Sequence, residues 1–185
     1  MIHLAAKRLV IRDPKLSDFN NWHQLMSDPK TMYYLQDIQT HAEDETLMNL
    51  QEAVRDISNP NREKYFLVIE LGESGDFVGS IGYTVKTRTP AGKIVHLGYF
   101  ILPKHHNKDY VTEALKELLR FAFDEDNVYR IETGCLAENY ASERVMQKCG
   151  FIFEGAFKEC EWHDGKMKDR VSYRLLKYEY KMSDK

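Results

Sequence analysis

Hydrophobic and polar residues alternate along the chain with two periods, about 3.6 residues in some segments and about two in others. Apolar residues at the longer period predict amphipathic helices, and strict alternation predicts strands with one buried face. The helical pattern predicts helices at residues 16–26, 40–57, 110–123 and 141–149. The alternating pattern predicts strands at residues 8–12, 65–70, 77–85, 94–102, 130–136, 151–161 and 171–178.

Capping and turn residues mark several of these boundaries. Thr40 and Glu43 form a capping-box pattern before the second helix. Ser17 and Asp18 are cap candidates for the first helix. Residues 163–166 carry the Asp-Gly signal of a tight hairpin, so we expect the last two strands to pair antiparallel.

The order of the elements indicates how the sheet is connected. Three strands between residues 65 and 102 are separated by short segments that contain Gly or Pro, which is typical of an antiparallel meander. The strand at 94–102, the helix at 110–123 and the strand at 130–136 form a crossover unit, which favours one parallel pair. We predict a mixed α/β fold, with a central, mostly antiparallel sheet, one parallel crossover and helices on both faces.

Composition narrows the class of protein. A chain of 185 residues is near the usual size of one domain, so we expect residues 1–185 to form a single domain. With 43% hydrophobic residues, 30% charged residues and no long apolar run, we expect no membrane partner. A formal net charge of −3 lacks the basic excess of a general nucleic-acid binder, so no nucleic-acid partner is expected either.

The cysteines indicate a reducing compartment, and the spacing of the metal-ligating residue types indicates no metal site. Cys135, Cys149 and Cys160 are an odd number at wide spacing, with no paired Cys-x-x-Cys motif. No cluster of His, Cys or carboxylate residues has ligand spacing. We therefore expect reduced thiols, a cytoplasmic location and no bound metal.

A polar loop joins the strand at 94–102 to the helix at 110–123, and this arrangement suits anions. The unpaired backbone N–H groups and the positive dipole of a helix amino terminus can hold a phosphate. Lys104, Lys108 and the two histidines, His105 and His106, add to this attraction. Capping alone also explains a polar loop before a helix, so the loop by itself leaves both readings open.

Six sequence segments carry a resemblance to a known family. They are RLVIR, FVGSIGY, HLGYFILP, YVTEAL, RIETGCLAENYASERVMQKCGFIFEG and DGKMKDRVSYRLL. Their order and spacing resemble the GNAT superfamily of N-acetyltransferases, most closely its branch of ribosomal-protein amino-terminal acetyltransferases. The resemblance implies acetyl-CoA as cosubstrate and a V-shaped split between the strands at 97–102 and 130–136. It also implies that the pantetheine arm pairs with backbone groups of Phe100, Ile101 and Leu102.

The same resemblance implies that one loop holds the pyrophosphate of the cosubstrate. This phosphate loop consists of His106, Asn107, Lys108, Asp109, Tyr110 and Val111. The family pattern has Gln or Arg, two residues, Gly, one residue and then Gly or Ala, and these places fall on His106, Asp109 and Val111. The Asp109 carboxylate either repels the phosphates or caps the helix while Lys104 and Lys108 face them. We expect coenzyme A to bind more weakly than in a glycine-containing relative.

Candidates for catalysis lie around the helix at 141–149. Acyl transfer to an amine needs a neutral nucleophile, a polarised thioester carbonyl and a proton for the departing thiolate. In many members of the family a tyrosine supplies that proton, and its place is taken here by Met146. The resemblance implies that Ser142 acts instead and that Asn139 holds pantetheine. In the alternative, Asn139 and Ser142 only cap the short helix.

Two residues are candidates for the base that deprotonates the incoming ammonium group. The resemblance places the glutamate of the ribosomal-protein branch at Glu161, on the strand before the hairpin. His96 occupies the place where relatives often carry a glutamate, and an unperturbed pKa of about 6.5 suits base catalysis near neutrality. A histidine in a strand is also commonly a packed, hydrogen-bonded residue, so both candidates stay open.

Four aromatic residues are candidates for the wall of an acceptor site opposite the cosubstrate. They are Trp22, Tyr33, Tyr34 and Trp162, and core packing is the alternative. The acceptor is expected to be an amine: a protein amino terminus, a small amine such as a polyamine, or an aminoglycoside-type drug.

We predict an acetyl-CoA-dependent N-acetyltransferase, an enzyme of the acyltransferase class that works by direct attack. Cys135 and Cys149 lie in apolar runs without an adjacent histidine, so neither marks a covalent nucleophile. The alternative is a non-catalytic module that binds coenzyme A or a protein partner, which Asp109 and Met146 favour. A homodimer that pairs through an exposed strand edge at 171–178 also stays open.

Overall fold

The computed structural model describes residues 1–183 of the chain. Within them the strands are β1 (His3–Ala5), β2 (Leu9–Arg12), β3 (Lys64–Leu71), β4 (Phe77–Thr89), β5 (Gly92–Ile101), β6 (Val128–Leu136), β7 (Ile152–His163) and β8 (Lys166–Leu176). The helices are α1 (Phe19–Ser27), α2 (Glu43–Asp56), α3 (Tyr110–Arg120), α4 (Tyr140–Lys148) and α5 (Lys177–Ser183). The short turns are the 3-10 helices η1 (Leu16–Asp18) and η2 (Pro103–His105) and the π-helical η3 (Phe121–Glu125). In this described part of the chain, no helix is both long and apolar enough to span a membrane.

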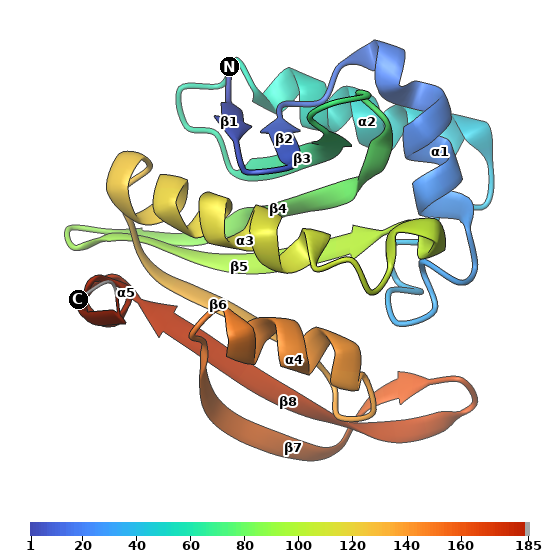
Figure 1. Cartoon of the computed structure of the whole chain (residues 1–185). Coiled ribbons are helices and arrows are strands. Elements are labelled where there is room, and N and C mark those ends of the chain that lie inside the picture. The colour runs from blue at the N-terminus through green and yellow to red at the C-terminus, as the bar shows by residue number, and fades with distance from the viewer. Residues whose placement is uncertain (184–185) are drawn as a thin grey trace. The chain divides into compact units, whose positions relative to one another are not determined.

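The strands form one sheet in the order β1-β2-β3-β4-β5-β6-β8-β7 (Figure 1). The pairings of β1 with β2, β2 with β3, β3 with β4, β6 with β8 and β7 with β8 are antiparallel, whereas β5 and β6 are parallel. The prediction of a mixed α/β fold with one parallel crossover is therefore confirmed. The parallel register runs from Lys93 to His96 on β5, and the V-shaped split stays a prediction.

The chain divides into two compact units, and the single domain expected from its length stays a prediction. Unit 1 comprises Met1–Thr84 and Gly98–Leu118, and unit 2 comprises Val85–Leu97 and Leu119–Lys185. The border between them crosses β4 and β5, so each unit contains part of both strands.

The core of unit 1 holds α1 and α2 against the sheet. Trp22 and Leu25 of α1 and Leu50 of α2 are at most 2% exposed and pack with Val68 of β3. Burying each such side chain stabilises the fold by about 1.5–3 kcal/mol. Leu102, which follows β5, belongs to the same cluster, so this core also fixes the end of β5.

Both faces of β3 are covered in unit 1. Successive residues of a strand point to opposite faces, and Leu67, Val68 and Ile69 are all 0% exposed. Ala114 and Leu115 of α3 are equally buried. This burial agrees with the predicted helices on both faces.

Unit 2 contains β6, β8 and the edge strand β7. Ile131 of β6 and Leu175 of β8 are at most 3% exposed and belong to its core. The hairpin between β7 and β8 turns at Asp164 and Gly165, whose φ angles are 49° and 76°. Positive φ angles at both positions are typical of a two-residue hairpin turn, so the hairpin predicted at 163–166 is confirmed.

The predicted start of α2 is wrong by one turn. α2 begins at Glu43, and Thr40 lies outside it, with its hydroxyl 2.7 Å from the hydroxyl of Thr46. Glu45 takes the capping role that the sequence pattern assigns to Glu43, because its carboxylate accepts the backbone N–H of Ala42 at 3.3 Å. Two acidic residues in one turn made the pattern ambiguous.

The described chain ends in a helix where the sequence pattern predicts a strand. β8 ends at Leu176 and α5 begins at Lys177. Glu179 explains the change, because its carboxylate accepts the backbone N–H of Leu176 and pairs with Arg174. β8 also lies between β6 and β7, so the prediction of an exposed edge at 171–178 is wrong and the sheet ends at β7 instead.

Candidate active site

Imidazole contacts anchor the segment that connects β5 to α3 in unit 1. His105 is 6% exposed, and its Nε2 lies 3.1 Å from the carbonyl oxygen of Phe77. Nε2 of His106 lies 3.2 Å from the carbonyl oxygen of Ile101. These contacts fix the chain where it leaves β5.

His105 contributes no positive charge to this segment. Its Nδ1 is buried and has no hydrogen-bond partner among the described residues. Burial lowers the pKa of His105, opposed by the contact with the Phe77 carbonyl. The positive charges of Lys104 and Lys108 lower it further. The ring is therefore neutral near pH 7, and the local positive charge comes from the lysines.

The phosphate loop contains two non-glycine residues with left-handed backbones. The φ angles of Asn107 and Asp109 are 59° and 58°. This conformation costs a residue with a Cβ about 1–2 kcal/mol, although Asn and Asp adopt it more readily than most residues. Asp109 stands where the family pattern has glycine, so the backbone angle gives a physical reason for that glycine.

α3 begins directly after Asp109. The carbonyl oxygen of Asp109 accepts the N–H of Glu113 at 3.0 Å, and a helix amino terminus presents backbone N–H groups that can donate to an anion. The backbone of Tyr110 and Val111 therefore lies at the positive end of an 11-residue helix. Together with the exposed Lys108, this end of α3 fits an anion such as a pyrophosphate.

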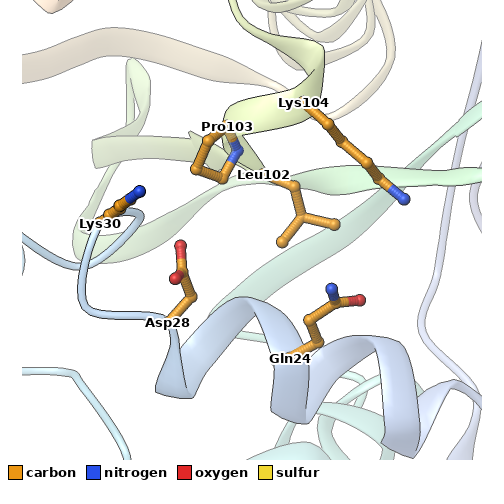
Figure 2. Close-up of a pocket in the computed structure, with 6 residues that line it drawn as sticks. All are labelled: Gln24, Asp28, Lys30, Leu102, Pro103 and Lys104. Atoms are coloured by element: carbon orange, nitrogen blue, oxygen red, sulfur yellow. The ribbon is translucent and has the colours of Figure 1, made fainter.

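A pocket of about 260 Å³ lies beside the end of β5 (Figure 2). Its lining residues are Gln24, Asp28, Lys30, Leu102, Pro103 and Lys104. The hydroxyl and the N–H of Thr31 donate to the Asp28 carboxylate at 2.6 and 2.8 Å, and the hydroxyl bond is the main cause that lowers the pKa of Asp28. The pocket thus offers one charged carboxylate and two ammonium groups beside apolar side chains, and no sequence pattern indicated it.

The four predicted acceptor-wall residues divide between core and surface. Trp22 is 2% exposed, and its indole N–H donates to Asn49 at 2.9 Å. Core packing, the alternative reading, therefore describes Trp22. Tyr33 is 37% exposed, and its ring lies edge-on to that of Tyr34 with 4.8 Å between centroids. Trp162, in unit 2, is 69% exposed.

Asn139 caps α4 in unit 2. Its side-chain oxygen accepts the backbone N–H of Ser142 at 3.1 Å, which is an N-cap contact. The Ser142 hydroxyl takes no part in that contact. Burial raises the pKa of the Cys135 thiol, and a hydrogen bond with the Ser142 side chain only partly offsets it. Cys135 is therefore protonated and unsuited to act as a nucleophile.

A tyrosine that the sequence patterns do not single out ties α4 to β8. The Tyr173 hydroxyl donates to Glu143 at 2.7 Å and accepts a hydrogen bond from Gln147 at 3.2 Å. Tyr173 is 4% exposed, and burial, followed by the contact with Glu143, raises its pKa. Met146, in the place of the family's tyrosine, is 0% exposed. This network fixes the helix that carries Ser142.

Glu161, the first candidate base, is engaged in an ion pair. Its Oε2 lies 2.6 Å from a guanidinium nitrogen of Arg170. The same guanidinium donates to the carbonyl oxygen of Gly134 on β6 at 3.2 Å. The Glu161 carboxylate is therefore already engaged by a guanidinium in this arrangement.

His96, the second candidate base, lies on β5 in unit 2 opposite Glu132 in the parallel register. The residue has exposed surface, yet partial burial of its ring lowers its pKa. The positive charges of Arg170 and Lys86 lower the pKa further, against the opposite effect of Glu132. His96 is therefore neutral near pH 7, the state that a proton acceptor requires.

Metal-ligating side chains are dispersed in the part of the chain that the structure describes. No group of three or more His, Cys, Asp or Glu residues within 1–183 could hold a metal ion. Cys135 and Cys149 are buried, whereas Cys160 is exposed.

Known proteins are similar to this chain over most of its length. A family model described as an acetyltransferase (GNAT) domain matches residues 8–152. The uncharacterized N-acetyltransferase YnaD of Bacillus subtilis (strain 168) is 28% identical over 180 residues, which are 97% of this chain and 99% of that protein. The ribosomal-protein-serine acetyltransferase of Escherichia coli (strain K12) is 27% identical over 73 residues, 40% of this chain and 41% of that one.

Solved structures share the fold. The crystal structure of a GNAT-family acetyltransferase from Bacillus anthracis matches with a TM-score of 0.80 and 28% identity, over 96% of this chain and 99% of that one. A ribosomal L7/L12 alpha-N-protein acetyltransferase in complex with coenzyme A matches with a TM-score of 0.82, over 95% of this chain and 98% of that one. Its identity is 18%, so this second likeness concerns the fold alone.

Proposed function

Because the chain belongs to the GNAT family of acetyltransferases, we propose that it transfers the acetyl group of acetyl-CoA to a primary amine. Membership of this family makes the chain an acyltransferase. The observation that carries the choice of cosubstrate is the exposed turn of Asn107 and Asp109 at the amino end of α3. Backbone amides and the helix dipole at such a turn favour a pyrophosphate group.

The proposed cosubstrate contacts follow from what each unit offers. In unit 1, the phosphate loop binds the pyrophosphate, and backbone groups of Phe100, Ile101 and Leu102 pair with pantetheine. In unit 2, the side-chain oxygen of Asn139 is used in the α4 cap. Its amide nitrogen is therefore the atom that would donate to pantetheine.

We assign the proton transfers to His96 and Ser142. We propose His96 as the base, because its lowered pKa keeps the ring neutral at pH 7. Glu161 is assigned a supporting role, since its ion pair with Arg170 holds the guanidinium whose charge reaches His96. The Ser142 hydroxyl, which is not needed for the cap, donates toward the departing thiolate. The amine attacks the thioester carbonyl directly, without a covalent enzyme intermediate.

A peptide amino terminus is the acceptor class that we favour over a polyamine. The pocket beside β5 offers the Asp28 carboxylate to an ammonium group and the ammonium groups of Lys30 and Lys104 to a carbonyl or carboxylate. A peptide carries both kinds of group, whereas a polyamine carries only positive charges. The similarity to a ribosomal-protein-serine acetyltransferase supports the same choice. In unit 1, the exposed Tyr33 is a further candidate for acceptor contacts.

The first experiment is calorimetric titration of the purified protein with acetyl-CoA and with coenzyme A. Saturable one-site binding supports the cosubstrate assignment. No binding up to about 1 mM ligand, which corresponds to about −4 kcal/mol, would overturn it.

The second experiment incubates the protein with acetyl-CoA and peptides, polyamines or aminoglycosides, and identifies acetylated products by mass spectrometry. Acetylated peptide amino termini support the favoured acceptor class, whereas products only with polyamines or aminoglycosides contradict it. Tight coenzyme A binding without any product would favour the non-catalytic module, to which the buried Met146 at the tyrosine position points.

A further inference from the structure

The phosphate loop holds two strained residues without a glycine. Asn107 and Asp109 both have left-handed φ angles, 59° and 58°. Such conformations persist only when surrounding contacts hold them. Lys108 lies between the two, so a contact made to its backbone acts on both.

Arg8, distant in the sequence but in the same unit, supplies that contact. Its Nη2 donates to the carbonyl oxygen of Lys108 at 3.0 Å. Its Nε donates to Oε2 of Glu113 at 2.7 Å, and its backbone N–H donates to Oε1 of the same carboxylate at 2.5 Å. Glu113 lies in the first turn of α3. Arg8 therefore holds the loop backbone and the start of the following helix together.

Arg8 is itself held in place. Its guanidinium carbon lies 4.7 Å from the centroid of the Tyr110 ring, a favourable cation–π distance. The carbonyl oxygen of Arg8 accepts the N–H of Gly72 at 2.8 Å, directly after β3. The side chains of Glu113 and Arg8 are 16% and 45% exposed, so the ion pair is shielded from solvent on the glutamate side and open on the arginine side. The loop is thereby tied through Arg8 to the sheet.

We propose that Arg8 is a positioning residue for the phosphate loop and compensates for the glycine that this loop lacks. The inference rests on the proposed function, in which the loop holds the pyrophosphate of acetyl-CoA. A glycine at residue 109 would adopt the left-handed angle without a steric cost. Asp109 does not, so the contacts of Arg8 and the identity of residue 109 are energetically coupled through Lys108.

The test is a double-mutant cycle with Arg8→Ala and Asp109→Gly, measured as the calorimetric Kd for coenzyme A. We expect Arg8→Ala alone to weaken binding about tenfold, and to weaken it about twofold or less when Asp109→Gly is also present. Arg120→Ala is the matched control, because Arg120 is paired with Glu125 at the other end of α3 and its side chain is 42% exposed. It should leave Kd unchanged.

Equal weakening by Arg8→Ala with and without Asp109→Gly would overturn the inference, as would an unchanged Kd in Arg8→Ala. Should Arg8→Ala not fold, Arg8→Lys keeps the charge but cannot bridge Lys108 and Glu113 at once. We expect about threefold weaker binding with an unchanged thermal midpoint, and an unchanged Kd contradicts the inference. Absence of binding by the unsubstituted protein is a different result, seen in the first titration, and it refutes the proposed function.

Discussion

Glu161 and Arg170 form an ion pair across the β7–β8 hairpin, with 2.6 Å between Oε2 and the guanidinium nitrogen. The same guanidinium reaches the carbonyl oxygen of Gly134 on β6, so the contact spans three strands. Burial is the largest cause that lowers the pKa of His96, and the positive charge of Arg170 is the second. Arg170 is thus paired with one candidate base, Glu161, and its charge helps to keep the other, His96, neutral.

Replacing His96 should therefore impair catalysis more than replacing Glu161. We expect His96→Gln to lower kcat about 10²–10⁴-fold, the usual contribution of a general base, and Glu161→Gln to lower it about tenfold or less. Because a base must be neutral to accept a proton, activity falls as pH drops through the lowered pKa of His96, below about 6.5. Initial rates between about pH 5 and 8 should show this acid limb in the unsubstituted protein and not in His96→Gln. Loss of the limb in Glu161→Gln alone would assign the base to Glu161.

Asp109→Gly should tighten the binding of coenzyme A. It removes a carboxylate near the proposed phosphate position and relieves a left-handed φ of 58° that costs about 1 kcal/mol. We expect a gain of about fivefold or more in affinity, measured by calorimetry. Asn127→Gly is the matched control, since Asn127 also has a left-handed φ, 52°, but lies in unit 2 outside the phosphate loop. It should change stability and leave the affinity for coenzyme A as it is; no gain in affinity from Asp109→Gly would refute the repulsion.

Ser142→Ala separates catalysis from helix capping. Asn139 uses the backbone N–H of Ser142, so alanine at this position keeps the cap. We expect kcat to fall about 10–10²-fold while KM and the thermal midpoint change little. Asn139→Ala is the comparison, because it removes the cap itself and should cost about 1 kcal/mol of unfolding free energy. A Ser142→Ala variant with full kcat would leave the serine without a role in proton transfer.

The sequence predicts most of the fold because most elements have a strong local period. The Asp-Gly turn at 163–166 forms as expected, since its two residues readily adopt left-handed angles. α5 was missed because its signal is a single carboxylate, Glu179, that caps the end of β8. Alternating aromatic residues in the same segment match a strand just as well.

The candidate site is less predictable because it depends on contacts between residues that are distant in the sequence. Asn139 as a cap is a local pattern and is confirmed. Arg8 and Lys108 are 100 residues apart in the sequence, and neither a hydrophobic period nor a motif predicts their contact. The pairing of Glu161 with Arg170 needs the hairpin register, which a bulge between Phe157 and Glu161 shifts. Composition and spacing cannot supply either contact.

The stability of unit 1 should depend on pH through Asp18. Nη1 and Nη2 of Arg12 donate to both oxygens of Asp18 at 2.9 and 2.8 Å, and the same guanidinium also binds Glu70. Burial raises the pKa of Asp18, but the Arg12 contact and other hydrogen bonds outweigh it, so the folded-state pKa lies below its usual value. Because the shift is downward, its contribution is complete above the unfolded pKa of about 3.9 and is lost as pH falls through the folded value.

Asp18→Asn should therefore destabilise the protein by about 1.5–3 kcal/mol at neutral pH, since it leaves the Arg12 guanidinium without one of its carboxylates. Urea unfolding at several pH values should show this difference shrinking below about pH 4, where Asp18 of the unsubstituted protein takes up its proton. Asp37→Asn is the matched control, because Asp37 is an exposed aspartate of the same unit. It should change the free energy of unfolding by less than about 0.5 kcal/mol. A pH-independent loss in Asp18→Asn would mean that the carboxamide disturbs packing, and that the charge of Asp18 adds little to stability.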